Sequence, residues 1–143
     1  MCLYTRNKNG RFTIFGKTVY KVMDIDIETG SLYSFVKHFR YELGKTYEKS
    51  DNIFKQLDSW WPDVKNNRVY EINGQGYHSY PLSFVKREFK HFIIDEPIAL
   101  VKCRIPAFTR YYKGNDSISD KCYCSQKIKI ESVIKVKGKE EYE

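Results

Sequence analysis

The clearest strand pattern of the chain is Ala99-Leu100-Val101-Lys102-Cys103-Arg104-Ile105, which alternates along its length and stops at Pro106. Alternation with a period of two is typical of a strand that buries one face and exposes the other. The range 126–136 alternates in the same way, and its expected buried face carries Ile128, Ile130, Ile134 and Val136. These strands predict a mostly antiparallel sheet with one buried side and one side in water.

Shorter strands are expected on the N-terminal side of this pattern. Residues 11–15 and 18–23 flank Gly16-Lys17, a pair suited to a type II′ turn, and they therefore predict a β-hairpin. The polar range 24–34 favours a loop. The other expected elements are a short strand at 41–47 with a turn at Gly44, and a strand at 68–72.

Two helices are predicted by apolar residues that recur every three or four positions. The first begins near Asp51, ends at Pro62, and has an apolar side made of Ile53, Phe54, Leu57, Trp60 and Trp61. The second begins near Pro81, and its apolar side is Leu82, Val85, Phe89, Phe92 and Ile93. We therefore predict the α+β class, a mostly antiparallel sheet with two main helices packed on one side.

The length and composition of the chain fit a single domain. A chain of 143 residues that is 41% hydrophobic can bury one sizeable core. We expect one domain over 1–143, with a charged tail at 137–143 that frays. The chain has neither a run of about 18 apolar residues nor a secretory signal, so we expect no membrane partner and a cytoplasmic location. Reduced thiols are expected for Cys2, Cys103, Cys122 and Cys124.

The charge of the chain is positive and unevenly distributed. Lys and Arg outnumber Asp and Glu by 25 to 18, for a formal net charge of +7. Acidic residues gather in 24–28 and 140–143, which leaves 84–139 markedly basic. Such a surface attracts anions, although the same charge also serves solubility alone. We therefore expect an anionic small molecule or a nucleic acid as the partner, with a protein partner as the alternative.

The densest group of potentially functional residues is Gly74-Gln75-Gly76-Tyr77-His78-Ser79-Tyr80-Pro81, directly before the second expected helix. A histidine at this place can meet a ligand while backbone N–H groups of the helix start face an anion. The competing interpretation is a hydrogen-bonded corner histidine without a ligand. In the first interpretation the ligand-binding side chains are Lys21, His78, Ser79, Tyr80, Lys86 and Arg87.

A second cluster mixes cations with flat rings in Arg110-Tyr111-Tyr112-Lys113-Gly114-Asn115. Such side chains hold phosphates and stack on bases, which nucleotide binders and single-strand binders both need. An ordinary solvated loop is the alternative. We expect Arg110, Tyr112 and Lys113 to contribute to ligand binding.

Motifs for metal binding and catalysis are weak. In a strand, Cys122-Tyr123-Cys124 would point its sulfurs apart, whereas zinc sites usually use cysteines separated by two to four residues. The chain has no Walker loop and no complete G-x-G-x-x-G, and no histidine stands at a diagnostic spacing from a thiol. We therefore name no catalytic residue, no metal ligand and no cofactor. Whether the protein is an enzyme stays open, and we favour a protein without enzymatic activity.

Four motifs resemble a family of small uncharacterised proteins of bacteriophages and gut-type bacteria. They are Val19-Tyr20-Lys21-Val22, Tyr41-Glu42-Leu43-Gly44-Lys45-Thr46-Tyr47, Gly76-Tyr77-His78-Ser79 and Lys127-Ile128-Lys129-Ile130. The resemblance implies no established activity. It implies a phage or mobile-element accessory protein, such as one acting against host defence, in the cytoplasm of a bacterial host cell.

The chain also resembles, more loosely, ADP-ribosyltransferase-like domains. This resemblance rests on Tyr20-Lys21, His78-Ser79-Tyr80 and Cys103-Arg104-Ile105-Pro106. Lys21 stands where that family has Arg or His, and the late catalytic Glu is missing from 123–126, with Glu131 only later. Without a carboxylate near the sugar, nothing obvious stabilises an oxocarbenium-like transition state.

Three functions of different classes are therefore weighed. We favour non-catalytic binding of an anionic ligand, either a nucleotide signal or a nucleic acid. The first alternative is an ADP-ribosyltransferase-like enzyme that consumes NAD and depends on His78 or Glu131. The second is a protein-interaction or virion structural component, whose interface would use the many tyrosines and the two tryptophans.

Overall fold

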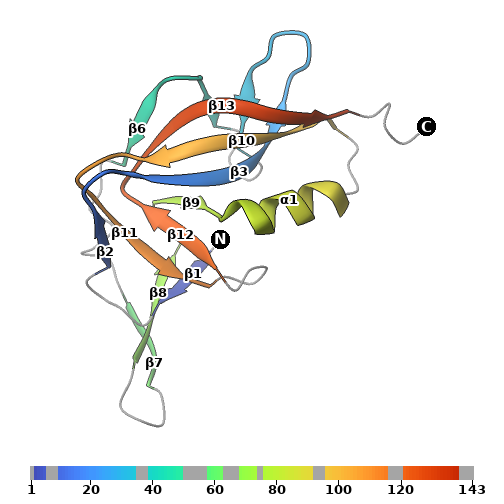
Figure 1. The fold of residues 1–143 in the computed structure, drawn as a ribbon. Helices are drawn as coiled ribbons and strands as arrows, with labels where there is room; N and C mark the ends of the chain where they lie inside the picture. The colour runs from blue at the N-terminus through green and yellow to red at the C-terminus, as the bar shows by residue number, and fades with distance from the viewer. Residues whose placement is uncertain are drawn as a thin grey trace.

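The computed structural model describes residues 2–5, 10–34, 39–49, 58–62, 68–73, 76–91, 96–115 and 121–138. Within them the strands form antiparallel sheets of six, four and three strands. Figure 1 shows the long strands β3 (Lys17–Ile25), β10 (Ile98–Ile105) and β13 (Lys127–Lys137) side by side, with the helix α1 (Leu82–His91) beneath them. The structure is therefore mostly β.

The six-stranded sheet has the order β5-β4-β3-β10-β13-β6. Its edge elements are short: β4 (Leu32–Tyr33), β5 (Arg40–Tyr41) and β6 (Thr46–Glu48). The two edges meet, because the ring centroids of Tyr41 in β5 and Tyr47 in β6 lie 5.1 Å apart. The Tyr47 hydroxyl also accepts a hydrogen bond of 2.8 Å from the backbone N–H of Glu42. The sheet is thus curled around an apolar interior that contains Val19, Met23, Val101, Cys103 and Ile130.

The four-stranded sheet continues the six-stranded one around a bend. Its order is β2-β11-β12-β9, from β2 (Arg11–Thr13), β11 (Thr109–Gly114), β12 (Cys122–Ser125) and β9 (Tyr77–Ser79). The chain passes from β2 into β3, from β10 into β11 and from β12 into β13, and the first two bends lie together at the left of Figure 1. The third sheet has the order β1-β8-β7, from β1 (Cys2–Thr5), β8 (Arg68–Asn73) and β7 (Asp58–Pro62).

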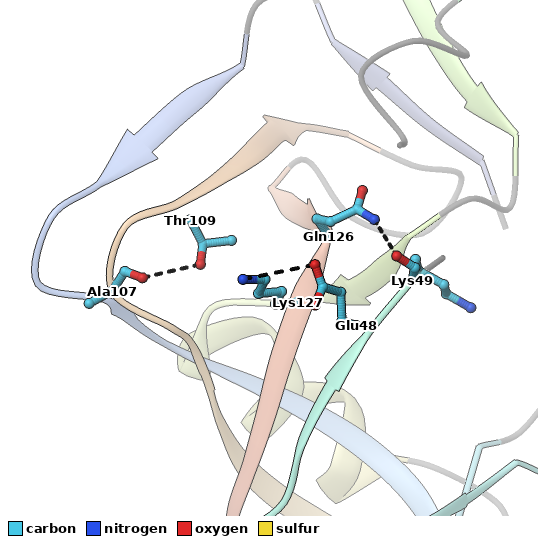
Figure 2. Close-up of polar contacts among 6 residues, drawn as sticks. All are labelled: Glu48, Lys49, Ala107, Thr109, Gln126 and Lys127. Carbon is cyan, nitrogen blue, oxygen red and sulfur yellow. Dashed lines mark hydrogen bonds and ion pairs between the residues drawn. The ribbon is translucent and has the colours of Figure 1, made fainter. Parts of the chain in front are cut away.

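Side chains fix the bends between the sheets. Figure 2 shows Gln126, between β12 and β13, donating from Nε2 to the carbonyl of Lys49 at 2.6 Å. The next residue, Lys127, lies 3.8 Å from a carboxylate oxygen of Glu48. In the bend between β10 and β11 the hydroxyl of Thr109 donates to the carbonyl of Ala107 at 3.4 Å. These contacts hold the four-stranded sheet at a set angle to the long strands.

The helix α1 begins as its sequence predicts. The carbonyl of Pro81 accepts hydrogen bonds from the backbone N–H groups of Phe84 and Val85, at 3.2 and 3.3 Å. At the other end the ammonium of Lys137 donates to the carbonyls of Phe89 and Lys90, at 3.4 and 3.2 Å, and so satisfies carbonyls that a helix end leaves open. The apolar side of α1 packs on Ile98, Leu100, Tyr112, Cys122 and Cys124.

The prediction of an α+β fold with two main helices is wrong. Residues 58–62, expected to end the first helix, form β7 and pair with β8, and 51–57 lie outside the described residues. Aromatic residues such as Trp60 and Trp61 also favour strands. Apolar residues three and four positions apart therefore did not decide between a helix and a strand. In the described part of the chain α1 is the one helix, and the strands dominate.

The predicted hairpin at 11–23 is also wrong. The strand β2 pairs with β11, whereas β3 pairs with β10 and β4. Gly16, at φ 86°, makes a bend between two sheets instead of a tight turn between paired strands. The range 24–34 is not all loop, since β3 extends to Ile25 and β4 pairs with it. The expected strand at 41–47 is two edge strands, with the predicted turn at Gly44 between them.

The sheet does not keep one whole side in water, because both faces of the first half of β10 are buried. Ile98 and Leu100 face α1, and Ala99, Val101 and Cys103 face the curled interior. The strand β13 also departs from the expected single face. Its apolar residues Ile128 and Ile130 are fully buried, but Ile134 is 50% exposed and Val136 is 38% exposed, because two register shifts against β10 interrupt the alternation.

Two further expectations concern the ends and the membrane. Lys137 lies in β13, Gly138 is buried, and the rest of the expected tail, 139–143, is outside the described residues. In the part of the chain that the structure describes, no helix combines the length and the apolar character needed to cross a bilayer.

Candidate functional site

The side chain of Lys21 points into the curled interior. Lys21 lies opposite Val101 on the face of β3 that also carries Val19 and Met23. Its ammonium donates to the carbonyl of His78 at 2.7 Å and lies 6.0 Å from the ring centroid of Tyr41. Burial disfavours the charged ammonium and lowers the pKa of Lys21 below its usual value. The structure therefore brings Lys21 to His78, but the ammonium contacts the backbone carbonyl of the histidine and not its imidazole.

The strand β9 holds the next two expected side chains. His78 is half-buried opposite Cys124, and Ser79 is buried opposite Tyr123. Among the described residues the hydroxyl oxygen of Ser79 meets no hydrogen-bond partner. Tyr80 is buried with its ring centroid 5.0 Å from that of Phe84, and its backbone exchanges two hydrogen bonds of 2.9 Å with Tyr20. The corner before the helix is therefore mainly a packed joint between the sheets.

The cations of α1 lie on the opposite side of β3 from the ammonium of Lys21. The helix packs on the face of β3 that carries Tyr20 and Val22. Lys86 and Arg87 are exposed on its outer side, and Nε of Arg87 lies 3.9 Å from a carboxylate oxygen of Glu88. These two cations and Lys21 are therefore not brought together.

The three expected residues of β11 are divided between its two faces. Tyr112 is fully buried under α1, and this burial raises the pKa of its hydroxyl to about 12. Arg110 is exposed on the same face, whereas Lys113 is half-buried on the opposite face across from Tyr123. The ring of Tyr112 belongs to the core, and the two cations face solvent on either side of the strand.

Glu131, the carboxylate named for the transferase alternative, lies in a bulge of β13. Its neighbours Ile130 and Ser132 pair with Cys103 and Lys102, and Glu131 has no partner in this register. Within the described residues its Oε1 is buried without a hydrogen-bond partner. Burial raises the pKa of Cys103 to about 12, and the charge of Glu131 adds to the rise while Lys21 opposes it. This part of the interior is polar but enclosed.

The bends between the sheets form a surface that the sequence did not reveal, which we call the basic corner. It consists of the exposed or half-buried residues Arg11, Phe12, Thr13, Ile14, Phe15, Lys17, Arg104, Phe108, Arg110, Lys113 and Lys121. Nη2 of Arg104 donates to the carbonyl of Phe15 at 2.8 Å, and the backbone N–H of Phe108 donates to the carbonyl of Thr13 at 2.7 Å. A Cβ on Gly16 would lie 2.8 Å from Nε of Arg104, so glycine allows this crossing. The two bends are therefore tied side by side.

Three phenylalanines of the basic corner are exposed to water. Phe12 is 56% exposed, Phe15 85% and Phe108 71%. The ring centroids of Phe12 and Phe108 lie 6.5 Å apart. Phe108 also has a left-handed backbone, with φ of 59°, which is uncommon for a residue other than glycine and costs about 1–3 kcal/mol. Apolar rings held in water on a strained bend are a feature of binding surfaces.

Three cations of the basic corner lie close enough to Lys113 to lower its pKa. Burial lowers the pKa of Lys113 first, and the positive charges of Arg11, Lys121 and Lys17 lower it further. The ammonium of Lys17 lies 4.8 Å from the ring centroid of Tyr123. Bringing like charges together raises the local positive potential, which favours an anion at this place.

The segments that build the basic corner have no acidic residue. Residues 10–23, 97–115 and 121–130 contain ten of the 25 Lys and Arg residues and none of the 18 Asp and Glu residues. Acidic residues lie at the other end of β3 and β10, where Asp24, Asp26, Glu28 and Glu96 line an open hollow of about 540 Å³. Along the paired strands β3 and β10, these carboxylates therefore lie at the end away from the basic corner.

Sequence reasoning found Arg110 and Lys113 but missed most of the basic corner. The missed residues are Arg11, Phe12, Phe15, Lys17, Phe108 and Lys121. The lack of acidic residues in the three segments was a readable signal. The exposure of the rings was not, because alternation alone placed Phe12 and Phe15 in an ordinary strand.

Within the described residues, the cysteines that are candidate metal ligands are Cys103, Cys122 and Cys124. The described residues contain no group of three or more His, Cys, Asp or Glu side chains suited to a metal ion. Cys103, Cys122 and Cys124 are buried thiols that form no disulfide, as predicted for these three. Burial raises the pKa of Cys124, like that of Cys103, to about 12, so both thiols stay protonated and unreactive at neutral pH.

Comparison of the chain with family models, with curated proteins and with solved structures finds no match in any of the three. The resemblances to the phage family and to ADP-ribosyltransferase-like domains therefore stay predictions.

Proposed function

We propose that the protein binds nucleic acid at the basic corner and catalyses no reaction on it. The observation that supports this most is that strand pairing joins two segments without acidic residues, 11–17 and 104–113, whose exposed or half-buried cations are Arg11, Lys17, Arg104, Arg110 and Lys113. A phosphate backbone presents negative charge at a regular spacing, so it can use several cations at once. Arg110 and Lys113, expected from the sequence, are members of this surface.

The charges account for affinity but not for sequence preference. Each phosphate that a Lys or Arg neutralises releases a condensed counterion, so binding weakens as salt is added. Contacts from Arg11, Lys113 and Lys121 alone would give a slope of about −2 for log K against log salt on a single strand. Phosphate contacts carry little base information, so affinity should depend weakly on sequence.

Fluorescence anisotropy with labelled oligonucleotides tests this function. We expect the protein to bind an oligothymidine of about 20 nucleotides at about 50 mM salt, and to lose affinity by about 200 mM. The variant Arg11→Glu/Arg110→Glu/Lys121→Glu, whose three sites are exposed, should bind at least about tenfold more weakly.

The matched control is Lys45→Glu/Lys90→Glu/Lys135→Glu, which changes net charge equally at three exposed sites away from the basic corner. It should keep most of the affinity. Equal losses in the two triple variants would show that net charge, and not this surface, drives binding. No binding of any single or double strand at low salt would overturn the proposed function.

A further inference from the structure

The exposed rings of the basic corner add a property that charge alone does not explain. We propose that the basic corner binds single-stranded nucleic acid by stacking unpaired bases on Phe12 and Phe108, with Phe15 beside them. This inference rests on the proposed function, and it names the form of nucleic acid that the surface takes.

The two principal rings form a platform that is open to water. Their centroids are 6.5 Å apart and their planes are inclined by 49°, so neither ring covers the face of the other. Both residues are more than half exposed. Every base has a flat apolar face, so stacking of this kind tolerates any sequence.

The platform is held before any ligand arrives. The backbone N–H of Phe108 donates to Thr13, and Arg104 donates to the carbonyl of Phe15. These bonds fix the bends that carry the rings, so little conformational entropy remains to be lost on binding. A phenylalanine at φ 59° is hard to explain by folding alone, because glycine or asparagine fits that backbone better.

Cations and rings are arranged around one strand edge. The strand β2 is an edge of the four-stranded sheet, and its consecutive residues Arg11 and Phe12 point to opposite faces. Arg110 pairs with Phe12 on the ring side, whereas Arg11 pairs with Tyr111 and shares the other face with Lys113. A flexible single strand can pass over this edge, with phosphates on the cations and bases on the rings.

A duplex cannot use the platform in this way. Its bases are paired and stacked inside the helix, and it bends smoothly only over lengths far greater than this edge. It can still contact the cations through its phosphates. The rings therefore predict a preference for single strands over duplex, in addition to the salt dependence that charge predicts.

The test compares three oligonucleotides of equal length by competition: oligothymidine, its duplex with oligoadenosine, and an abasic strand. The single strand should compete at least about tenfold better than the duplex or the abasic strand, since each stacked base contributes about 5- to 150-fold. The variant Phe12→Ala/Phe108→Gly should lose this advantage and keep the salt slope of the wild type. Glycine suits the backbone of residue 108, so folding should be preserved, and a melting curve checks this.

The matched control is Ile27→Ala/Ile134→Ala, which removes two apolar side chains that are 55% and 50% exposed elsewhere. It should bind as the wild type does. Equal competition by all three oligonucleotides, or full binding by the phenylalanine variant, would overturn the inference while the proposed function stands. The exposed rings would then be assigned to a protein partner. Absence of any binding would overturn both.

Discussion

The two ends of the β3 and β10 pair carry opposite charge on the same framework. At one end Lys17 lies opposite Ile105, next to the exposed rings of the basic corner. At the other end Asp24 lies opposite Ile98, beside the acidic hollow. Both ends expose apolar side chains, since Phe15 is 85% exposed and Ile27 is 55% exposed. What differs is the sign of the charge around them.

This difference shows that a net charge of +7 understates the local field of the protein. Cations and carboxylates are separated along the long strands, so a polyanion is attracted to one end and repelled from the other. Exposed charges more than a Debye length apart, about 8 Å at physiological salt, act almost independently. The two ends can therefore be changed separately, and their effects compared.

The largest expected effect is a difference in the free energy of unfolding between removal of a buried ring and removal of an exposed ring. Tyr112→Ala should lower the free energy of unfolding by about 3–5 kcal/mol, because it leaves a cavity under α1. Phe15→Ala should change it by less than about 0.5 kcal/mol, because the ring is already in water. Urea denaturation of both variants measures the contrast. A large loss for Phe15→Ala would mean that the rings of the basic corner support the fold.

The next effect concerns binding at the two ends. Arg11→Glu/Arg110→Glu should weaken binding of a single strand by about tenfold or more. Glu28→Lys/Glu96→Lys changes net charge by the same magnitude with opposite sign, and it should strengthen binding by less than about threefold, because screening isolates the hollow. Both pairs are measured by anisotropy at about 150 mM salt. Changes of equal size would show that the two ends contribute alike to binding.

A smaller effect is expected from the buried thiols between the two ends. The pKa of Cys103 and of Cys124 is about 12 in the folded protein, against a usual value of 9.0. The unfolded chain therefore loses these protons first as pH rises, so stability present below pH 9 falls toward pH 12. We expect a loss of about 1 kcal/mol for each thiol between about pH 8 and pH 10.

The variant Cys103→Ala/Cys124→Ala isolates this loss. Its stability is lower at every pH, but it should fall less steeply than that of the wild type as pH rises. Lys21 contributes with the opposite sign in both proteins, since its lowered folded pKa makes stability rise with pH up to the unfolded value of 10.5. Parallel pH profiles of the two proteins would contradict the burial of the thiols.

The smallest effect tests the strained bend. Phe108→Asn should leave the free energy of unfolding unchanged or raise it by less than about 1 kcal/mol, because asparagine tolerates a left-handed backbone. The same change should weaken binding of a single strand. Thermal denaturation and anisotropy on one preparation show both results. A clear loss of stability would show that the ring of Phe108 packs against the protein.

Local sequence patterns predicted the elements that can be identified without knowing which strand they pair with. Residues 99–105 and 126–136 alternate strongly, and the apolar side of 82–91 repeats every three or four positions, so β10, β13 and α1 could be read directly. Residues 58–62 could not, because their strand depends on pairing with 68–73. The hairpin at 11–23 failed for the same reason, since the partner of β2 is almost a hundred residues away.

The candidate site was predicted only in part. The alternation of β3 places Lys21 with Val19 and Met23 on a face that the sheet buries. The interpretation of Tyr20-Lys21 as a motif overlooked the burial of this face. Arg110 and Lys113 were found because cations and rings are adjacent in the sequence. Phe12 and Phe108 meet only where two bends are tied together, which no local pattern encodes.

Photochemical cross-linking of a single strand to the protein, followed by peptide mapping, tests the central claim most directly. An oligonucleotide that carries photoreactive thymine analogues would be irradiated with the wild-type protein, and the complex digested with trypsin. We predict cross-links in the peptides 12–17 and 105–110, which trypsin releases by cleaving at Arg11, Lys17, Arg104 and Arg110. Cross-links confined to α1 or to the acidic hollow, with none in these two peptides, would contradict binding at the basic corner.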